Sequence, residues 1–165
     1  MEACKAGFIY TVEHIGRGGE VLSVEQAQNI IPTAGLNYIL GATLTGQSQF
    51  TAWYLGLYSN NYTPIAADTA STFIGNAGEN QAYTGTERQT ITFPAVSNGS
   101  VSTLSDPNIF NFTSSQTIRG AFIATTPAWG GTTGLVISAL LFPSPKNVSS
   151  GESLKVPVGF TLISG

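Results

Sequence analysis

The chain has 165 residues, a net charge of −3 and one histidine, and only 9% of its residues are charged, against about 25% in an ordinary globular domain. Its six lysine and arginine side chains are scattered along the sequence, which excludes the clustered basic patch that nucleic-acid binding requires. The single cysteine, Cys4, excludes an intrachain disulfide, and the length predicts one domain covering residues 1–165.

The N-terminal region predicts a β-hairpin over residues 8–25. The runs FIYTVEHI (8–15) and EVLSVE (20–25) flank the sequence GRGG, and a glycine-rich connection between β-branched and aromatic runs is typical of a hairpin. We expect the hairpin either to join the core or to extend as an arm to a neighbouring subunit. Three residues would make that contact: Phe8, Tyr10 and Val12. Glu2 stands where a signal peptide carries cations, so no signal peptide is expected.

The stretch 31–44, IPTAGLNYILGATL, predicts the one α-helix, over residues 33–44. Thr33 is placed to cap its N-terminus. Four apolar side chains fall on one face at helical spacing: Leu36, Ile39, Leu40 and Leu44. Because Gly35 and Gly41 weaken so short a helix, we expect it to form only by packing against a sheet.

Downstream, β-branched and aromatic runs are separated by turn signals such as Asn98-Gly99. The predicted strands are 50–58, 88–96, 100–104, 109–113, 117–125, 134–143 and 152–163. The segment 59–87 is expected to be a long loop, with at most a helical turn at 66–72. Together these elements predict an all-β fold, an antiparallel β-sandwich or jelly-roll-like barrel of about eight or nine strands with one short α-helix.

Strand 50–58 has apolar or aromatic side chains on both faces. Trp53, Leu55 and Leu57 share one face, and Phe50, Ala52, Tyr54 and Tyr58 share the other. Burial of both faces is typical of a central strand between a helix and a second sheet or neighbouring subunit. Core packing explains this pattern, but Tyr54, Tyr58 and Tyr62 also suit a subunit contact. Trp129, in a predicted loop, suits a lid over the sandwich end, an interface hot spot or a sugar platform.

The sequence is poor in the titratable groups that catalysis needs. His14 is predicted to point away from its neighbour Glu13, because successive strand residues face opposite sides. One histidine and one cysteine do not complete a zinc site. Four carboxylates fall in predicted loops or at strand edges and are expected to be solvated: Asp68, Glu79, Glu87 and Asp106. We therefore predict no catalytic residue, no metal site and no cofactor.

Several motifs follow one another through the chain. They are GLNYILGATLTGQSQFTAWYLGLYSNNYTPIAADTASTF (35–73), TERQ (86–89), TIRGAFI (117–123) and GGTTGLVISALLFPSPKNVSSGESLKV (130–156). These stretches resemble a family of small virion structural proteins of tailed bacteriophages and prophages. Members show a GLNYLL helix, a WYIGLY strand followed by NYTP and a DT turn, and a late TTGxLxSxxxF strand before a GxxLxV end. The resemblance covers roughly residues 28–163.

This resemblance implies a head decoration, or cement, protein that binds the major capsid protein on the capsid surface and is assembled in the host cytoplasm. The low charge fits this, since surfaces short of charge tend to lie against other protein. A homotrimer at threefold lattice positions is the first expectation for the assembly, and a dimer at twofold positions is the second. No nucleic-acid partner is expected, because the basic side chains are scattered. No membrane partner is expected, because the longest apolar run, 135–142, is far shorter than the roughly 20 residues that cross a bilayer.

Two alternatives stay open. The first is a tail or fibre component of the virion. The second is a carbohydrate-binding β-sandwich module that stacks sugars on Trp129, Tyr62 or Tyr83.

Overall fold

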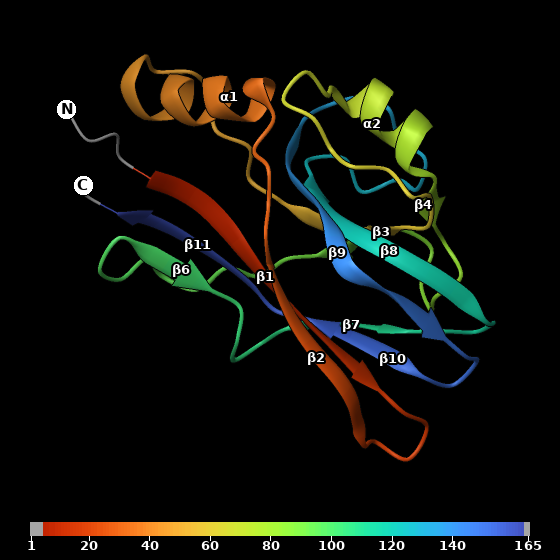
Figure 1. Ribbon diagram of the computed structural model, residues 1–165. Coiled ribbons are helices and arrows are strands. Elements are labelled where there is room, and N and C mark those ends of the chain that lie inside the picture. Colours follow the sequence, from red (N-terminus) through yellow and green to blue (C-terminus); the bar gives the residue numbers. More distant parts are fainter. Residues whose placement is uncertain (1–4, 164–165) are drawn as a thin grey trace.

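In the computed structural model, which describes residues 5–163, eleven β-strands form two antiparallel sheets and two α-helices pack against them (Figure 1). The strands are β1 (Lys5–Ile15), β2 (Val21–Gln28), β3 (Tyr54–Tyr58), β4 (Glu79–Asn80), β5 (Gln89–Thr90), β6 (Ser100–Ser102), β7 (Asn108–Asn111), β8 (Gln116–Ala124), β9 (Val136–Val148), β10 (Ser153–Val156) and β11 (Val158–Ile163). The helices are α1 (Thr33–Leu44) and α2 (Ala70–Ala77). This architecture confirms the predicted all-β sandwich.

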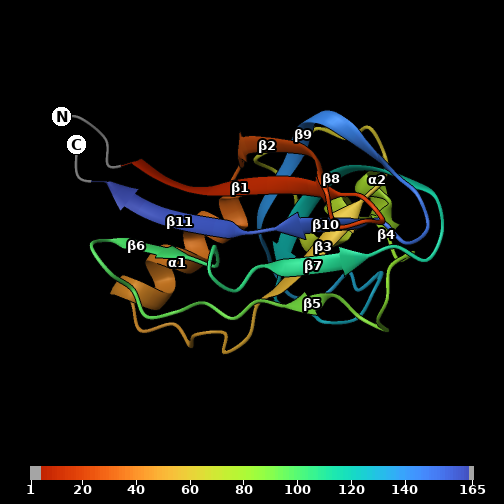
Figure 2. The same cartoon turned by 90° about the horizontal axis from the view of Figure 1, so that it is seen from below.

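The first sheet is built around β1. One edge of β1 pairs with β2, and the other pairs with β11 along residues 5–10 and with β10 along residues 13–15. Between these two strands the backbone N–H of Thr11 donates to the Pro157 carbonyl oxygen at 3.1 Å, so the register is continuous. The predicted strand 152–163 is therefore one run, divided at a proline that has no N–H to donate. β7 and β6 form the outer row of this sheet (Figure 2).

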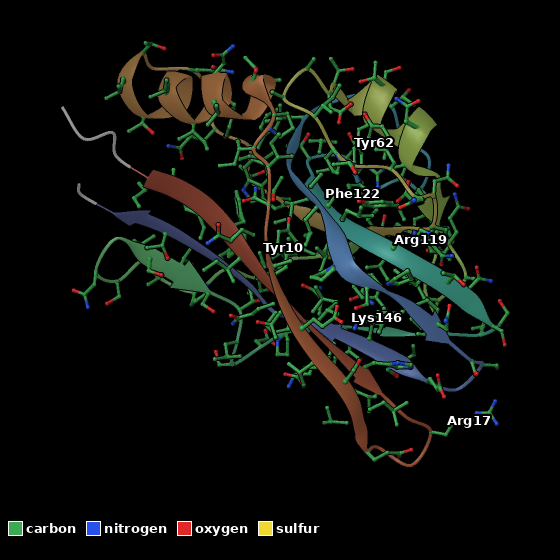
Figure 3. All side chains as sticks on the ribbon, viewed as in Figure 1. Tyr10, Arg17, Tyr62, Arg119, Phe122 and Lys146 are labelled. Atoms are coloured by element: carbon green, nitrogen blue, oxygen red, sulfur yellow. The ribbon has the colours of Figure 1, made fainter. Side chains whose placement is uncertain are left out.

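The predicted N-terminal hairpin is confirmed, since β1 and β2 pair along most of their length. It belongs to the core, as Figure 3 shows for Tyr10, whose hydroxyl donates to Ser138 Oγ of β9 at 2.6 Å. Three hairpin residues proposed for an interface are buried between the sheets: Phe8, Tyr10 and Val12. Because an interface needs accessible atoms, the interpretation of these three as contact residues is corrected. Cys4 lies outside the described residues.

The second sheet runs β9–β8–β3, with β4 and β5 sharing the far edge of β3. β3 starts at Tyr54 rather than at residue 50, because the backbone N–H of Phe50 donates to the Tyr38 hydroxyl on α1 at 2.7 Å instead of to a strand. Leu55 faces the other sheet and Tyr58 faces α2, so the predicted burial of both faces is confirmed. The helix on that face, however, is α2.

Helix α1 has the predicted bounds but a different environment. Its N-cap is Pro32, and the Thr33 N–H donates to the Ala66 carbonyl oxygen at 2.8 Å, so the prediction of Thr33 as cap was wrong. At Gly35, a Cβ atom would lie 3.1 Å from the Ile137 carbonyl oxygen, and glycine therefore lets α1 approach the backbone of β9. The leucines of the predicted apolar face are instead exposed: Leu36 at 44%, Leu40 at 56% and Leu44 at 74%.

The segment 59–87, expected to be a long loop, contains α2 and β4. A capping box starts α2: Thr69 Oγ1 accepts from the Thr72 N–H, and Thr72 Oγ1 accepts from the Thr69 N–H. Gly78, at a φ of 64°, ends the helix in the left-handed conformation. The helix packs its own Phe73 against Tyr58 of β3 and Phe122 of β8, which form an aromatic cluster on the outer face of the second sheet.

Candidate functional site

Charge is distributed unevenly over the molecule. Residues 29–67, which include α1 and the irregular segment 45–53, contain no charged side chain. In Figure 3, Arg17 and Lys146 lie away from α1, toward the turn of the β1–β2 hairpin. We call α1 with residues 45–53 the uncharged end. We call the region around the hairpin turn the charged end, which contains His14, Arg17, Glu25, Lys146 and Glu152.

Four ionisable groups of the charged end form two pairs. His14 Nε2 lies 2.9 Å from Glu152 Oε2, and Lys146 Nζ lies 3.0 Å from Glu25 Oε2. The Ser149 N–H and the His14 side chain hold the pKa of Glu152 below its usual range. Burial opposes ionisation of Glu25, yet hydrogen bonds from Ser144 and Lys146 lower its pKa. These contacts hold the hairpin against β9 and the β9–β10 connection, which is a structural role.

The orientation predicted for His14 is confirmed. Glu13 points to the opposite side of the strand and pairs with Lys155, with Nζ 3.1 Å from Oε2. The partner of His14 is Glu152, which is 138 residues away in sequence. Local strand geometry therefore could not predict this pair.

Two of the four carboxylates expected to be solvated are buried. The Glu79 side chain is 2% exposed and that of Arg88 is 1% exposed, and they form two hydrogen bonds of 2.7 and 2.8 Å. Asp68 accepts from the Tyr62 hydroxyl at 2.7 Å and from the Ile65 N–H at 2.9 Å. The prediction was wrong for two reasons: the segment folds back on itself around Asp68, and Glu79 accepts from Arg88 and from the distant Gly130 N–H at 2.7 Å. The other two are exposed as expected: Glu87 and Asp106.

The four remaining interface candidates have different environments. Tyr58 is fully buried, and its hydroxyl donates to the Leu140 carbonyl oxygen at 2.8 Å, so Tyr58 cannot serve an interface of the folded chain. Tyr54, Tyr62 and Trp129 are half-buried, and their assignment as contact residues stays a prediction.

The sugar-binding alternative depended on aromatic rings with a free face. Trp129 Nε1 donates to the Tyr83 hydroxyl at 2.8 Å, and the two rings meet edge to face with centroids 5.4 Å apart. Tyr83 is buried, so it presents no ring face to a sugar. Trp129 packs against the core as part of the same cluster.

The uncharged end carries a row of leucines. Leu36, Leu40 and Leu44 are spaced by four residues and therefore form one line along α1. We call these three residues the leucine ridge. All three are exposed, and exposed apolar patches on soluble proteins commonly mark interaction sites. The sequence identified these residues but placed them against a sheet.

A pocket opens beside the ridge, between α1, segment 45–53 and the end of the sandwich. Its volume is about 270 Å³. Six aromatic side chains contribute to its lining: Phe8, Tyr38, Phe50, Trp53, Phe93 and Phe160. Sequence reasoning missed this pocket, because its walls come from segments distant in the chain. The one local signal was the aromatic content of 38–53 in a stretch without charge.

The chain matches no protein-family model, and a search of curated proteins found no match either. Within residues 5–163, no helix is both long and apolar enough to cross a membrane. In the same part of the chain, no three histidine, cysteine, aspartate or glutamate side chains gather as a metal site. The resemblance to virion proteins thus has no support from these comparisons, and the surface of the chain carries the functional inference.

Proposed function

We propose that the chain is a non-enzymatic head decoration protein of a tailed bacteriophage, which binds the major capsid protein through its uncharged end and stabilises the head. The observation that carries this is the leucine ridge, whose three side chains are 44, 56 and 74% exposed within a stretch free of charge. The sequence resemblance suggests the particle, and the ridge suggests the contact. The location is the outer capsid surface, after assembly in the host cytoplasm.

The size of the ridge favours a multivalent attachment. The exposed surface of its three side chains equals that of roughly two fully exposed leucines. Covering this surface would contribute about 3–5 kcal/mol to the free energy of binding. Association itself costs about 4–15 kcal/mol. A single ridge is therefore too weak to hold one subunit, whereas a homotrimer presents three ridges at once and gains from their effective concentration. This favours trimers at threefold lattice positions.

The absence of charge at this end suits a protein–protein contact. Few ionic groups would have to lose their hydration on docking, so little of the apolar gain is offset. The charged end would stay outside the contact, so its ion pairs would pay no additional desolvation cost on docking.

The test uses capsids of the phage that encodes this chain, assembled without it and expanded. Purified wild-type protein should co-sediment with these capsids and raise their melting temperature. The double variant Leu40→Gln/Leu44→Gln should fold normally but bind at least tenfold more weakly. Leu22→Gln is the matched control, because Leu22 is 50% exposed on β2, outside the uncharged end, and it should bind like the wild type.

Two results would contradict the proposal. One is the absence of the chain from capsids, with label found on the tail in electron micrographs of virions, which would favour a tail or fibre component. The other is equal binding by the ridge variant and the control, which would move the contact elsewhere.

A further inference from the structure

We infer that the pocket beside the leucine ridge is a binding site for one uncharged aromatic ring. This inference concerns the pocket alone and does not rest on the proposed virion function.

The walls of the pocket are aromatic and already arranged. Phe8 and Phe160 project from the first sheet with centroids 4.5 Å apart, and Tyr38 lies 5.0 Å from Phe50 and 5.7 Å from Trp53. Aromatic rings attract one another in tilted and edge-to-face pairs at centroid separations of about 4.5–7 Å. A further ring entering the pocket would meet partners at these separations, on more than one side, without rearranging them.

The volume fits a single ring with a short substituent. A dry apolar cavity of about 150 Å³ is enough to bind benzene, and this pocket holds about 270 Å³. Its floor is aliphatic and comes from the second sheet, where Ile123 of β8 and Ile137 of β9 reach it. A sugar, which needs a dense set of polar partners, would leave most of its hydroxyl groups unpaired here.

The ligand must also be uncharged. No lining residue is ionisable except through the Tyr38 phenol, so an ammonium or carboxylate group would lose its hydration without gaining a counter-charge. Two polar side chains, Thr43 and Gln49, lie among the lining residues. The Thr43 hydroxyl already donates to the Ile39 carbonyl oxygen at 2.7 Å, and the Tyr38 hydroxyl already accepts from the Phe50 N–H. The Gln49 amide and the Trp53 indole N–H are the other groups of the lining that could pair with a hydroxyl or amide on the ligand.

Trp53 makes the site directly observable. The chain has two tryptophans, and Trp129 does not line the pocket. In a Trp129→Phe background, Trp53 is the sole tryptophan, and benzyl alcohol should shift its emission saturably, with a dissociation constant on the order of 1 mM. Benzylamine and benzoate, which carry the same ring with a charge, should bind at least tenfold more weakly.

Substitutions on α1 test the location. Ala42→Phe places a ring in the pocket and should abolish the response to benzyl alcohol. Thr33→Phe adds the same ring at an exposed position of α1 that does not line the pocket, and should leave the response unchanged. In the unaltered protein, methyl NMR signals of Ile123 and Ile137 should move with benzyl alcohol while that of Ile118 stays in place, a readout that needs no variant to fold.

N-acetylphenylalaninamide distinguishes the two possible sources of the ring. Tighter binding than benzyl alcohol would indicate a side chain of a partner protein, and weaker binding would indicate a free small molecule; either supports the site. The inference is overturned if benzyl alcohol moves neither Trp53 emission nor the isoleucine methyl signals, if Ala42→Phe responds normally, or if the charged analogues bind equally well. If the protein binds capsids but no aromatic ring, the ring-binding site is overturned and the proposed function stands.

Discussion

At the scale of single residues, the Arg88–Glu79 pair shows how this chain keeps charge inside. Arg88 also donates to the carbonyl oxygens of Thr126 and Gly131, and its guanidinium lies 5.0 Å from the centre of the Phe122 ring. The pair thereby ties the segment around β4 and β5 to the loop after β8. Burying such charges is costly, and only complete hydrogen bonding offsets the lost hydration.

Arg88→Met should leave the Glu79 carboxylate buried without its partner and lower the free energy of unfolding by about 3–5 kcal/mol. Urea denaturation measures this. Arg119→Met is the matched control, since Arg119 is half-exposed on β8, and should change stability by less than about 0.5 kcal/mol. The double variant Arg88→Met/Glu79→Leu should recover at least half of the loss. A loss no larger than that of the control would mean that the pair contributes nothing specific.

Tyr83 gives a pH dependence with a definite sign. Burial raises its pKa to about 12, although the hydrogen bond from Trp129 opposes this, while an unfolded chain has a tyrosine pKa of about 10. Between these values the unfolded state releases the proton and the folded state keeps it. The free energy of unfolding therefore falls as pH rises from 10 to 12, by up to about 1.4 kcal/mol per pH unit for this residue.

Tyr83→Phe removes this ionisation, so the free energy of unfolding of the variant should fall less steeply over pH 10–12 than that of the wild type. The difference in slope should correspond to about one proton. Denaturant titrations at several pH values measure the difference in slope. The comparison is made against wild type because burial also raises the pKa values of Tyr10 and Tyr58, which remain in both proteins. Identical slopes would contradict the assignment.

At the scale of elements, the two helices show which parts of the fold were predictable. The hairpin and the run 152–163 follow from local patterns of β-branched residues and turns, and both formed as expected. The packing of α1 did not follow, because it depends on contact between Gly35 and Ile137, about 100 residues apart in sequence. Helical spacing identifies a row of leucines but does not say which side meets the sheet.

The same reasoning explains the candidate site. The leucine ridge could be read from the sequence as a row of residues, although not as an exposed one. The pocket could not, because Phe8, Trp53, Phe93 and Phe160 come together only after both sheets have formed. Glu79 was misassigned for a related reason, since the Gly130 N–H that donates to it lies 51 residues away in sequence. Asp68 is instead covered by near neighbours in its own segment, Tyr62 and Ile65.

The two glycines of α1 provide a test of its packing. Gly35→Ala should destabilise the chain by about 1 kcal/mol, because its Cβ would lie 3.0–3.2 Å from Ile31 Cγ2 and from the Ile137 backbone, and this crowding exceeds the helix propensity gained. Gly41→Ala should stabilise by about 0.5–1 kcal/mol, since the atoms it would meet belong to the flexible Gln47 side chain. Thermal unfolding separates the two. Equal stabilisation by both would show that α1 does not press on β9.

At the scale of the whole molecule, the uneven distribution of charge makes the two ends of the molecule chemically different. Three of the four ion pairs among residues 5–163 involve the hairpin, the exception being Arg88–Glu79, while α1 and residues 45–53 contribute none. A subunit that docks by its uncharged end would leave the ion pairs of the hairpin outside the contact. Its attachment would then depend on apolar contact, which salt does not screen.

If the chain binds capsids as proposed, the position of its charges predicts how that binding responds to salt. Between 50 and 500 mM NaCl the affinity should change by less than about threefold, because few charges take part in the contact. Arg17→Glu, which reverses a charge at the charged end, should bind capsids like the wild type. Sedimentation of labelled protein with capsids at each salt concentration measures both. If docking used the charged end instead, added salt would weaken it steeply and Arg17→Glu would alter it, because interactions between exposed charges are screened over about 10 Å at 0.1 M ionic strength.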